Sequence, residues 1–90
     1  MNGSTNKTLM KFWAPWCRPC LAMKPVIEEV LGDFNDIEFV DINVDEDPDM
    51  AREYSIRTIP ALVLKEGDRV EKLIGSVSTK QVKDFLSKRA

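Results

Sequence analysis

The two cysteines of this 90-residue chain lie two residues apart, in the stretch Trp16-Cys17-Arg18-Pro19-Cys20. Here an apolar run gives way to a helical pattern. Side chains three residues apart share one face of a helix, so these thiols can close a disulfide within one turn. A bond that closes so short a loop removes little entropy from the unfolded chain and is a poor structural crosslink. The spacing therefore favours redox chemistry.

The two cysteines are predicted to have different roles. Cys17 falls at the start of the helix, where unpaired backbone N–H groups and the positive end of the helix dipole favour a thiolate, and Arg18 adds a positive charge. Cys20 lies one turn deeper and should be shielded from solvent. We therefore expect an accessible Cys17 to attack a substrate disulfide and Cys20 to resolve the mixed disulfide that forms.

The rest of the composition limits the alternatives. A zinc site or Fe–S cluster would need ligands from a second chain, because the sequence has no histidine and no further cysteine, so we expect no metal and no cofactor. A net charge of -2 and the lack of a basic stripe argue against nucleic acid. The absence of an apolar run of membrane length or of a signal peptide predicts a cytoplasmic protein. We expect a polar lead at residues 1–6 and one domain at 7–90.

Apolar periodicity predicts the order of the elements. Two runs joined by a helical pattern form a βαβ unit with parallel strands, and two later runs joined by a tight turn at 66–68 form a hairpin. The sequence Ser78–Gln81 matches a capping box, which starts a final helix. The predicted strands are 8–13, 38–44, 61–65 and 69–74, and the predicted helices cover 19–31, 50–54 and the segment from Ser78 to Leu86.

These elements, in this order, resemble a thioredoxin. The likeness is carried by the Trp16–Cys20 motif, by Pro25 inside the helix, by the turn Asn43-Val44-Asp45 and by Thr58-Ile59-Pro60. It implies a disulfide reductase that is reduced by a thioredoxin reductase, serves clients such as ribonucleotide reductase and acts as a monomer. It also implies a cis bond before Pro60. The substrate-binding residues that it implies are Trp16, Arg18, Pro19, Ile59, Pro60 and Gly75.

Three departures from the family pattern stand out. The few residues before the first strand cannot supply the family's leading strand and helix, so we expect an α/β minimal thioredoxin fold. Its four-stranded mixed sheet, in the order 38–44, 8–13, 61–65, 69–74, would be flanked by three helices and have an exposed edge at 38–44. Arg18 replaces a glycine. Lys11 replaces a buried acid that, in the family, takes the proton of the resolving cysteine.

Lys11 and Asp41 are expected to act together. In the family a lysine on the neighbouring strand pairs with the buried acid, and here that place holds Asp41, so the two charges look exchanged. A buried charge is costly without a partner, which favours an ion pair over the alternative that Lys11 extends to solvent. Asp41, directly or through water, would then accept the proton of Cys20, and Lys11 would favour its thiolate.

Two other functions remain open from the sequence. A glutaredoxin-like enzyme that is reduced by glutathione would have a similarly short core, although Trp16 and Pro19 favour a thioredoxin. A binding module with incidental cysteines is the alternative from another class. Turnover with thioredoxin reductase or with glutathione would separate the three.

Overall fold

The computed structural model describes residues 7–87, which form one mixed sheet with three helices. The strands are β1 (Lys7–Trp13), β2 (Ile37–Asn43), β3 (Ala61–Glu66) and β4 (Arg69–Ile74), and the helices are α1 (Arg18–Leu31), α2 (Pro48–Glu53) and α3 (Thr79–Ser87). The strand order is β2-β1-β3-β4, with β1 and β2 parallel and the other pairs antiparallel. This is the predicted fold class and strand order, with boundaries shifted by at most two residues.

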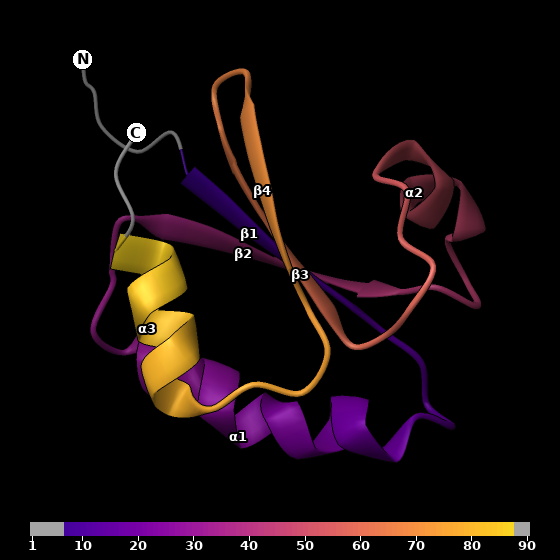
Figure 1. Cartoon of the computed structure of the whole chain (residues 1–90), viewed down its shortest axis with the longest axis horizontal. Helices are drawn as coiled ribbons and strands as arrows, with labels where there is room; N and C mark the ends of the chain where they lie inside the picture. Colours follow the sequence, from indigo (N-terminus) through magenta and orange to yellow (C-terminus); the bar gives the residue numbers. More distant parts are fainter. Residues whose placement is uncertain (1–6, 88–90) are drawn as a thin grey trace.

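Helices cover both faces of the sheet. Figure 1 shows α1 and α3 together on one side and α2 apart from them. Leu9 of β1 is fully buried in the core against α1 and α3, whereas Phe12 is fully buried in the core on the α2 side. The near-continuous apolar run of β1 follows from this burial on both faces.

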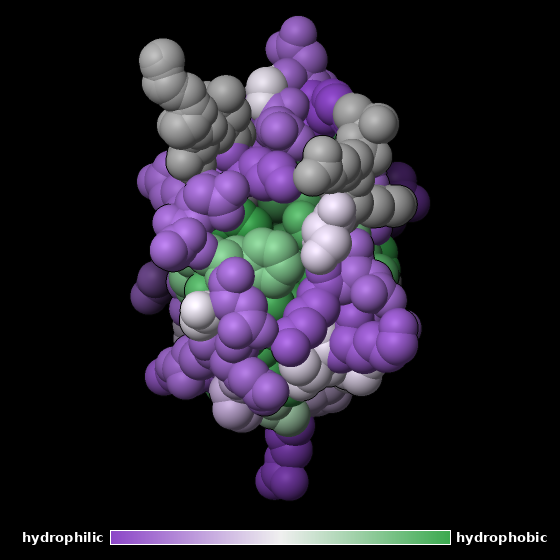
Figure 2. All heavy atoms as spheres, turned by 90° about the vertical axis from the view of Figure 1, so that its left-hand side faces the viewer, coloured by the Kyte–Doolittle hydropathy of each residue, from purple (hydrophilic) through white to green (hydrophobic). Residues whose placement is uncertain are grey.

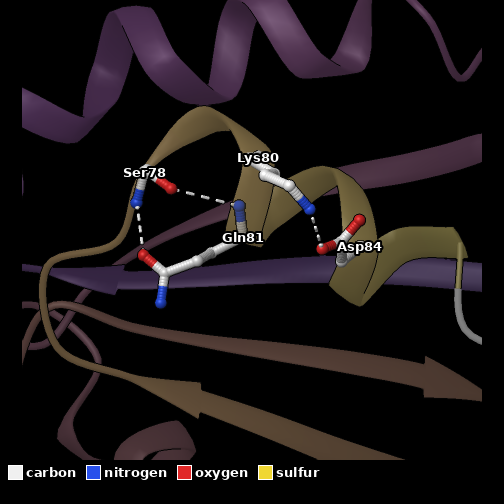
Figure 3. A network of polar contacts seen from close by, with 4 residues as sticks. All are labelled: Ser78, Lys80, Gln81 and Asp84. Carbon is white, nitrogen blue, oxygen red and sulfur yellow. Dashed lines mark hydrogen bonds and ion pairs between the residues drawn. The ribbon is translucent and has the colours of Figure 1, made fainter.

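The last helix begins where the capping box predicts. The Ser78 hydroxyl accepts a hydrogen bond from the Gln81 backbone N–H at 3.2 Å, and the Gln81 side-chain oxygen accepts one from the Ser78 N–H at 2.9 Å (Figure 3). An exposed ion pair between Lys80 and Asp84 follows one turn later. The two reciprocal bonds satisfy backbone donors that a helix start leaves free, so this boundary is set locally.

On the face shown in Figure 2, polar side chains surround a recessed apolar area. Within residues 7–87, no helix combines the length and the apolar character needed to cross a membrane. The predicted lead at residues 1–6 and the last residues of the predicted domain lie outside the described residues, so the domain limits stay predictions.

Candidate active site

The two cysteines meet at the start of α1. Cys17 is the N-cap residue of the helix and forms a disulfide with Cys20, with 5.3 Å between their Cα atoms. The Cys17 sulfur also accepts a hydrogen bond from the Cys20 backbone N–H at 3.3 Å. Pro19 lies in the first turn, where a helix makes no use of its missing N–H. The sulfur of Cys17 therefore occupies the place where a helix start stabilises negative charge.

The exposure of the two cysteines differs less than the sequence predicted. Cys17 is 7% exposed and Cys20 is 0% exposed, so the expectation of an accessible Cys17 is wrong for this disulfide form. Ala14, Trp13, Val44 and Ile59 pack around the pair and exclude water from it. Cys17 is still the more exposed of the two residues, and Arg18 and Pro19 beside it are exposed.

A loop before β3 forms the other wall of the site. Ile59 packs against the cysteines, and the Ile59–Pro60 peptide bond is cis. The Pro60 carbonyl accepts a hydrogen bond from the Gly75 N–H at 2.8 Å. Gly75 has φ +96°, a backbone conformation that favours glycine. The structure thus brings Ile59 and Pro60 to the cysteines and ties Gly75 to the same loop.

Trp16 is the most exposed large apolar side chain of residues 7–87, at 67%. Its indole N–H donates to an Asp45 carboxylate oxygen at 3.0 Å, and the Asp45 backbone N–H donates to the Asn43 side-chain oxygen at 2.9 Å. Asp45 is a site residue that the sequence did not predict, although it belongs to the turn Asn43-Val44-Asp45 that carries the family likeness. The bond fixes an exposed indole beside the disulfide, where it can contact a bound protein.

Lys11 is the one charged side chain that is buried within residues 7–87, with 4% exposed. Its ammonium nitrogen lies 5.7 Å from the centroid of the Trp13 ring, and Trp13 in turn packs against the cysteines. Burial lowers the pKa of Lys11 from its ordinary 10.5 and the Lys24 charge lowers it further, while Asp41 and Glu28 act in the opposite direction. A cationic group thus lies one aromatic ring away from the active site.

The predicted ion pair between Lys11 and Asp41 is not present as a direct contact. The two residues are register partners on β1 and β2 and line the same hollow, as expected for one face of the sheet. No ion pair within 4.0 Å joins them among the described residues, however, and Asp41 is exposed. The reason is that β2 is an edge strand, so its carboxylate reaches solvent while Lys11 of the central strand cannot.

Comparison with known proteins agrees with this geometry. The family model Thioredoxin matches residues 1–88. Thioredoxin 1 of Synechococcus elongatus is 39% identical over 87 residues, which cover 94% of this chain and 81% of that protein. Thioredoxin of Pyropia yezoensis is 43% identical over 82 residues, covering 89% and 77%. The solved structure of oxidised mitochondrial thioredoxin 3 from Saccharomyces cerevisiae superposes with a TM-score of 0.84 at 32% identity and covers 93% of this chain and 80% of that one.

Proposed function

The chain belongs to the thioredoxin family, and on this basis we propose which residues carry its activity and which partners it serves. It is a dithiol–disulfide oxidoreductase that reduces the disulfides of other proteins, and neither the glutaredoxin-like nor the purely binding alternative is favoured. The observation that carries the assignment is the Cys17–Cys20 disulfide at the start of α1, with a backbone N–H directed at the Cys17 sulfur.

In the proposed reaction, Cys17 attacks as the thiolate. Its sulfur bonds to one sulfur of the client disulfide, and the other client sulfur leaves as a thiolate that takes up a proton. Cys20 then loses its proton and attacks the Cys17 sulfur, which forms the Cys17–Cys20 disulfide and releases the second client thiol. Two electrons pass to the client, and the disulfide form described above is the product state.

The substrate-binding residues proposed are those that surround the cysteines. The exposed Trp16, Arg18 and Pro19 lie on one side of them, and the loop with Ile59, Pro60 and Gly75 lies on the other. An extended client segment can pair with the Ile59 backbone as an added strand, which places its disulfide over Cys17. This arrangement suits protein substrates because it recognises backbone rather than a particular side chain.

The proposed electron donor is a thioredoxin reductase. The proposed clients include enzymes with catalytic disulfides, such as ribonucleotide reductase, and the proposed compartment is the cytoplasm. A dithiol that must be re-reduced after each turnover needs a reducing compartment. The test is insulin reduction coupled to NADPH oxidation, with either thioredoxin reductase or glutathione and glutathione reductase. We expect turnover with thioredoxin reductase to be the faster by a wide margin. Faster turnover with glutathione would overturn this choice of donor.

Lys11 is proposed to support the Cys20 thiolate electrostatically through the intervening Trp13 ring. Asp41 has no hydrogen bond to Cys20 among the described residues, so we propose that the proton transfer predicted for it passes through water. In Lys11→Met we expect a higher pKa of Cys20 and slower resolution of the mixed disulfide. Asp41→Asn should slow the same step while leaving the fold intact, and an unchanged exchange rate would remove Asp41 from the mechanism.

Lys11→Met should also stabilise the fold. The folded-state pKa of Lys11 lies below its unfolded value near 10.5, so the unfavourable contribution of its charge is fully present below the folded pKa and disappears as pH rises to 10.5. Replacing the buried charge by an apolar side chain should add about 1–2 kcal/mol to the free energy of unfolding at neutral pH. Urea unfolding at several pH values measures this difference.

The matched control for this prediction is Lys65→Met, because Lys65 is exposed on β3 and is not among the charges that shift the pKa of Lys11. It should change stability little at any pH. The stability gap between Lys11→Met and the native protein should shrink as pH approaches 10.5, in the direction set by the lowered pKa of Lys11. If Lys11→Met is less stable than the native protein at neutral pH, or if the difference in stability does not depend on pH, the charge of Lys11 does not destabilise the fold.

A further inference from the structure

The charges of this chain are unevenly distributed. Residues 33–49, called the acidic segment below, contain eight carboxylates and no lysine or arginine. The whole chain has 15 acidic and 13 basic residues, so all 13 basic residues and only seven acidic ones lie elsewhere. The eight carboxylates belong to Asp33, Asp36, Glu38, Asp41, Asp45, Glu46, Asp47 and Asp49. A net charge of -2 therefore conceals a strongly negative region.

The acidic segment contains an open sheet edge. Its central part is β2, which pairs with β1 on one side and is the last strand of the described sheet on the other. The backbone N–H and C=O groups along such a side are free to pair with another extended chain. Within residues 7–87 no three metal-ligating side chains come together, so these carboxylates do not form a cation site there.

Hollows flank this strand on both faces of the sheet. On the α2 face, a hollow of about 370 Å³ is lined by the apolar Val40, Ile42 and Met50 and by the two acidic residues Glu46 and Asp47. On the α1 face, a smaller hollow of about 180 Å³ is mainly apolar, with Ile27, Leu31 and the 37% exposed Phe39 in its lining. The ammonium of the buried Lys11, which has no hydrogen bond or ion pair among the described residues, is on the wall of this second hollow.

We propose that the open side of β2 binds an extended basic segment of a disulfide-containing partner protein as an added strand. Successive side chains of a strand point to opposite faces, so alternate residues of the partner would enter the two hollows. Lysine or arginine fits the hollow with Glu46 and Asp47, and an apolar side chain fits the hollow lined by Phe39. Lys11 supplies a donor for an oxygen of the bound segment. The partner sequence that matches is an alternation of basic and apolar residues.

A second copy of this chain is a poorer occupant of the same edge. Pairing β2 with β2 of another copy would place two acidic segments side by side, and like charges across an interface oppose association. A basic partner instead gains attraction that speeds encounter and is weakened by salt. Charge complementarity therefore selects the partner.

The acidic segment is continuous with the active site. β1 and β2 are parallel, so Trp13 and Asn43 end them at the same edge of the sheet, and the Asp45 carboxylate accepts the hydrogen bond from Trp16. A segment bound along β2, about 20 Å long, reaches the cysteines at one end. The proposal rests on the proposed reductase function and adds a preference among its clients, namely those with a basic strand next to the disulfide.

Two synthetic peptide disulfides test this preference. In each peptide, a segment of about six residues follows the cysteine. Valine alternates with lysine in the first peptide and with serine in the second. Removing three of the eight carboxylates of the acidic segment with Glu38→Gln/Glu46→Gln/Asp47→Asn should lower kcat/KM for the lysine peptide about tenfold and leave kcat/KM for the serine peptide within about twofold. The effect should fade as salt rises from about 0.05 to about 0.5 M.

The matched control is Glu29→Gln/Glu66→Gln/Asp68→Asn, which removes the same charge at exposed positions outside the acidic segment. Equal losses in the two triple variants would overturn the proposal. So would an unchanged rate with a lysine peptide N-methylated at alternate residues, because the added strand needs its N–H groups. If the native protein forms dimers and the first triple variant changes the fraction of dimer, the open side of β2 binds a second copy of the chain instead. If the native protein fails to reduce even the serine peptide, the proposed function itself is wrong.

Discussion

Substitution of Cys17 by serine is expected to lower the rate of protein-disulfide reduction by at least about 10³-fold, since the accelerations typical of enzymes depend on the group that reacts. A serine hydroxyl at the start of α1 keeps the N-cap but cannot form a mixed disulfide at neutral pH. The fold should therefore survive while turnover falls to that of the buffer. Insulin reduction by dithiothreitol, with circular dichroism as the check on folding, measures both.

The control for the loss of activity is Arg18→Gly, which leaves both cysteines in place and removes a neighbouring exposed charge. Its rate should stay within about tenfold of the native rate, because an exposed charge interacts weakly through solvent. Retention of more than a tenth of the native rate in Cys17→Ser would show that the reaction does not begin at this sulfur.

Phe12→Ala is expected to be the most destabilising single change in the core. Phe12 is 0% exposed, lies on the central strand and has its ring 6.2 Å from that of Tyr54 on the α2 side. Truncating a buried phenylalanine to alanine costs about 3–5 kcal/mol, through lost burial and the cavity left behind. Domains of this size have a free energy of unfolding of about 5–15 kcal/mol, so much of the stability would be lost. Urea unfolding of the disulfide form measures the change.

The matched control is Phe39→Ala on the edge strand β2. Phe39 is 37% exposed, so its truncation should cost less than about 1.5 kcal/mol, well below the change for Phe12. Equal destabilisation by the two substitutions would contradict the account of the core, because it would mean that the central and the edge strand contribute alike. A normal unfolding midpoint for Phe12→Ala would do the same.

The sheet and helices could be predicted because their signals are local. The run of β1 is apolar on both faces, the turn at Gly67 joins two strands of matching length, and the capping box at Ser78 fixes the start of α3 by its own hydrogen bonds. The position of Cys17 at the start of the helix was also predicted from the local pattern, and the structure makes it the N-cap residue. None of these features depends on residues distant in the chain.

Three features that depend on distances between segments were not predicted. The strand register places Lys11 opposite Asp41, as predicted. Whether the two side chains form an ion pair depended on their exposure, which differs between a central strand and an edge strand. The bond from Trp16 to Asp45 spans 29 residues and has no local signal. The burial of Cys17 depends on Ile59 and Val44, which only the folded chain brings near.

The most direct test of the central claim compares mixed-disulfide formation in Cys20→Ser and Cys17→Ser. Each reduced variant is mixed with a peptide disulfide at neutral pH, quenched with acid and analysed by mass spectrometry. We predict a stable one-to-one adduct on Cys17 in the Cys20→Ser variant, because the thiol that would resolve it is missing, and no adduct in Cys17→Ser over the same time. An adduct that forms on Cys20 in Cys17→Ser, with none on Cys17 in the other variant, would contradict it.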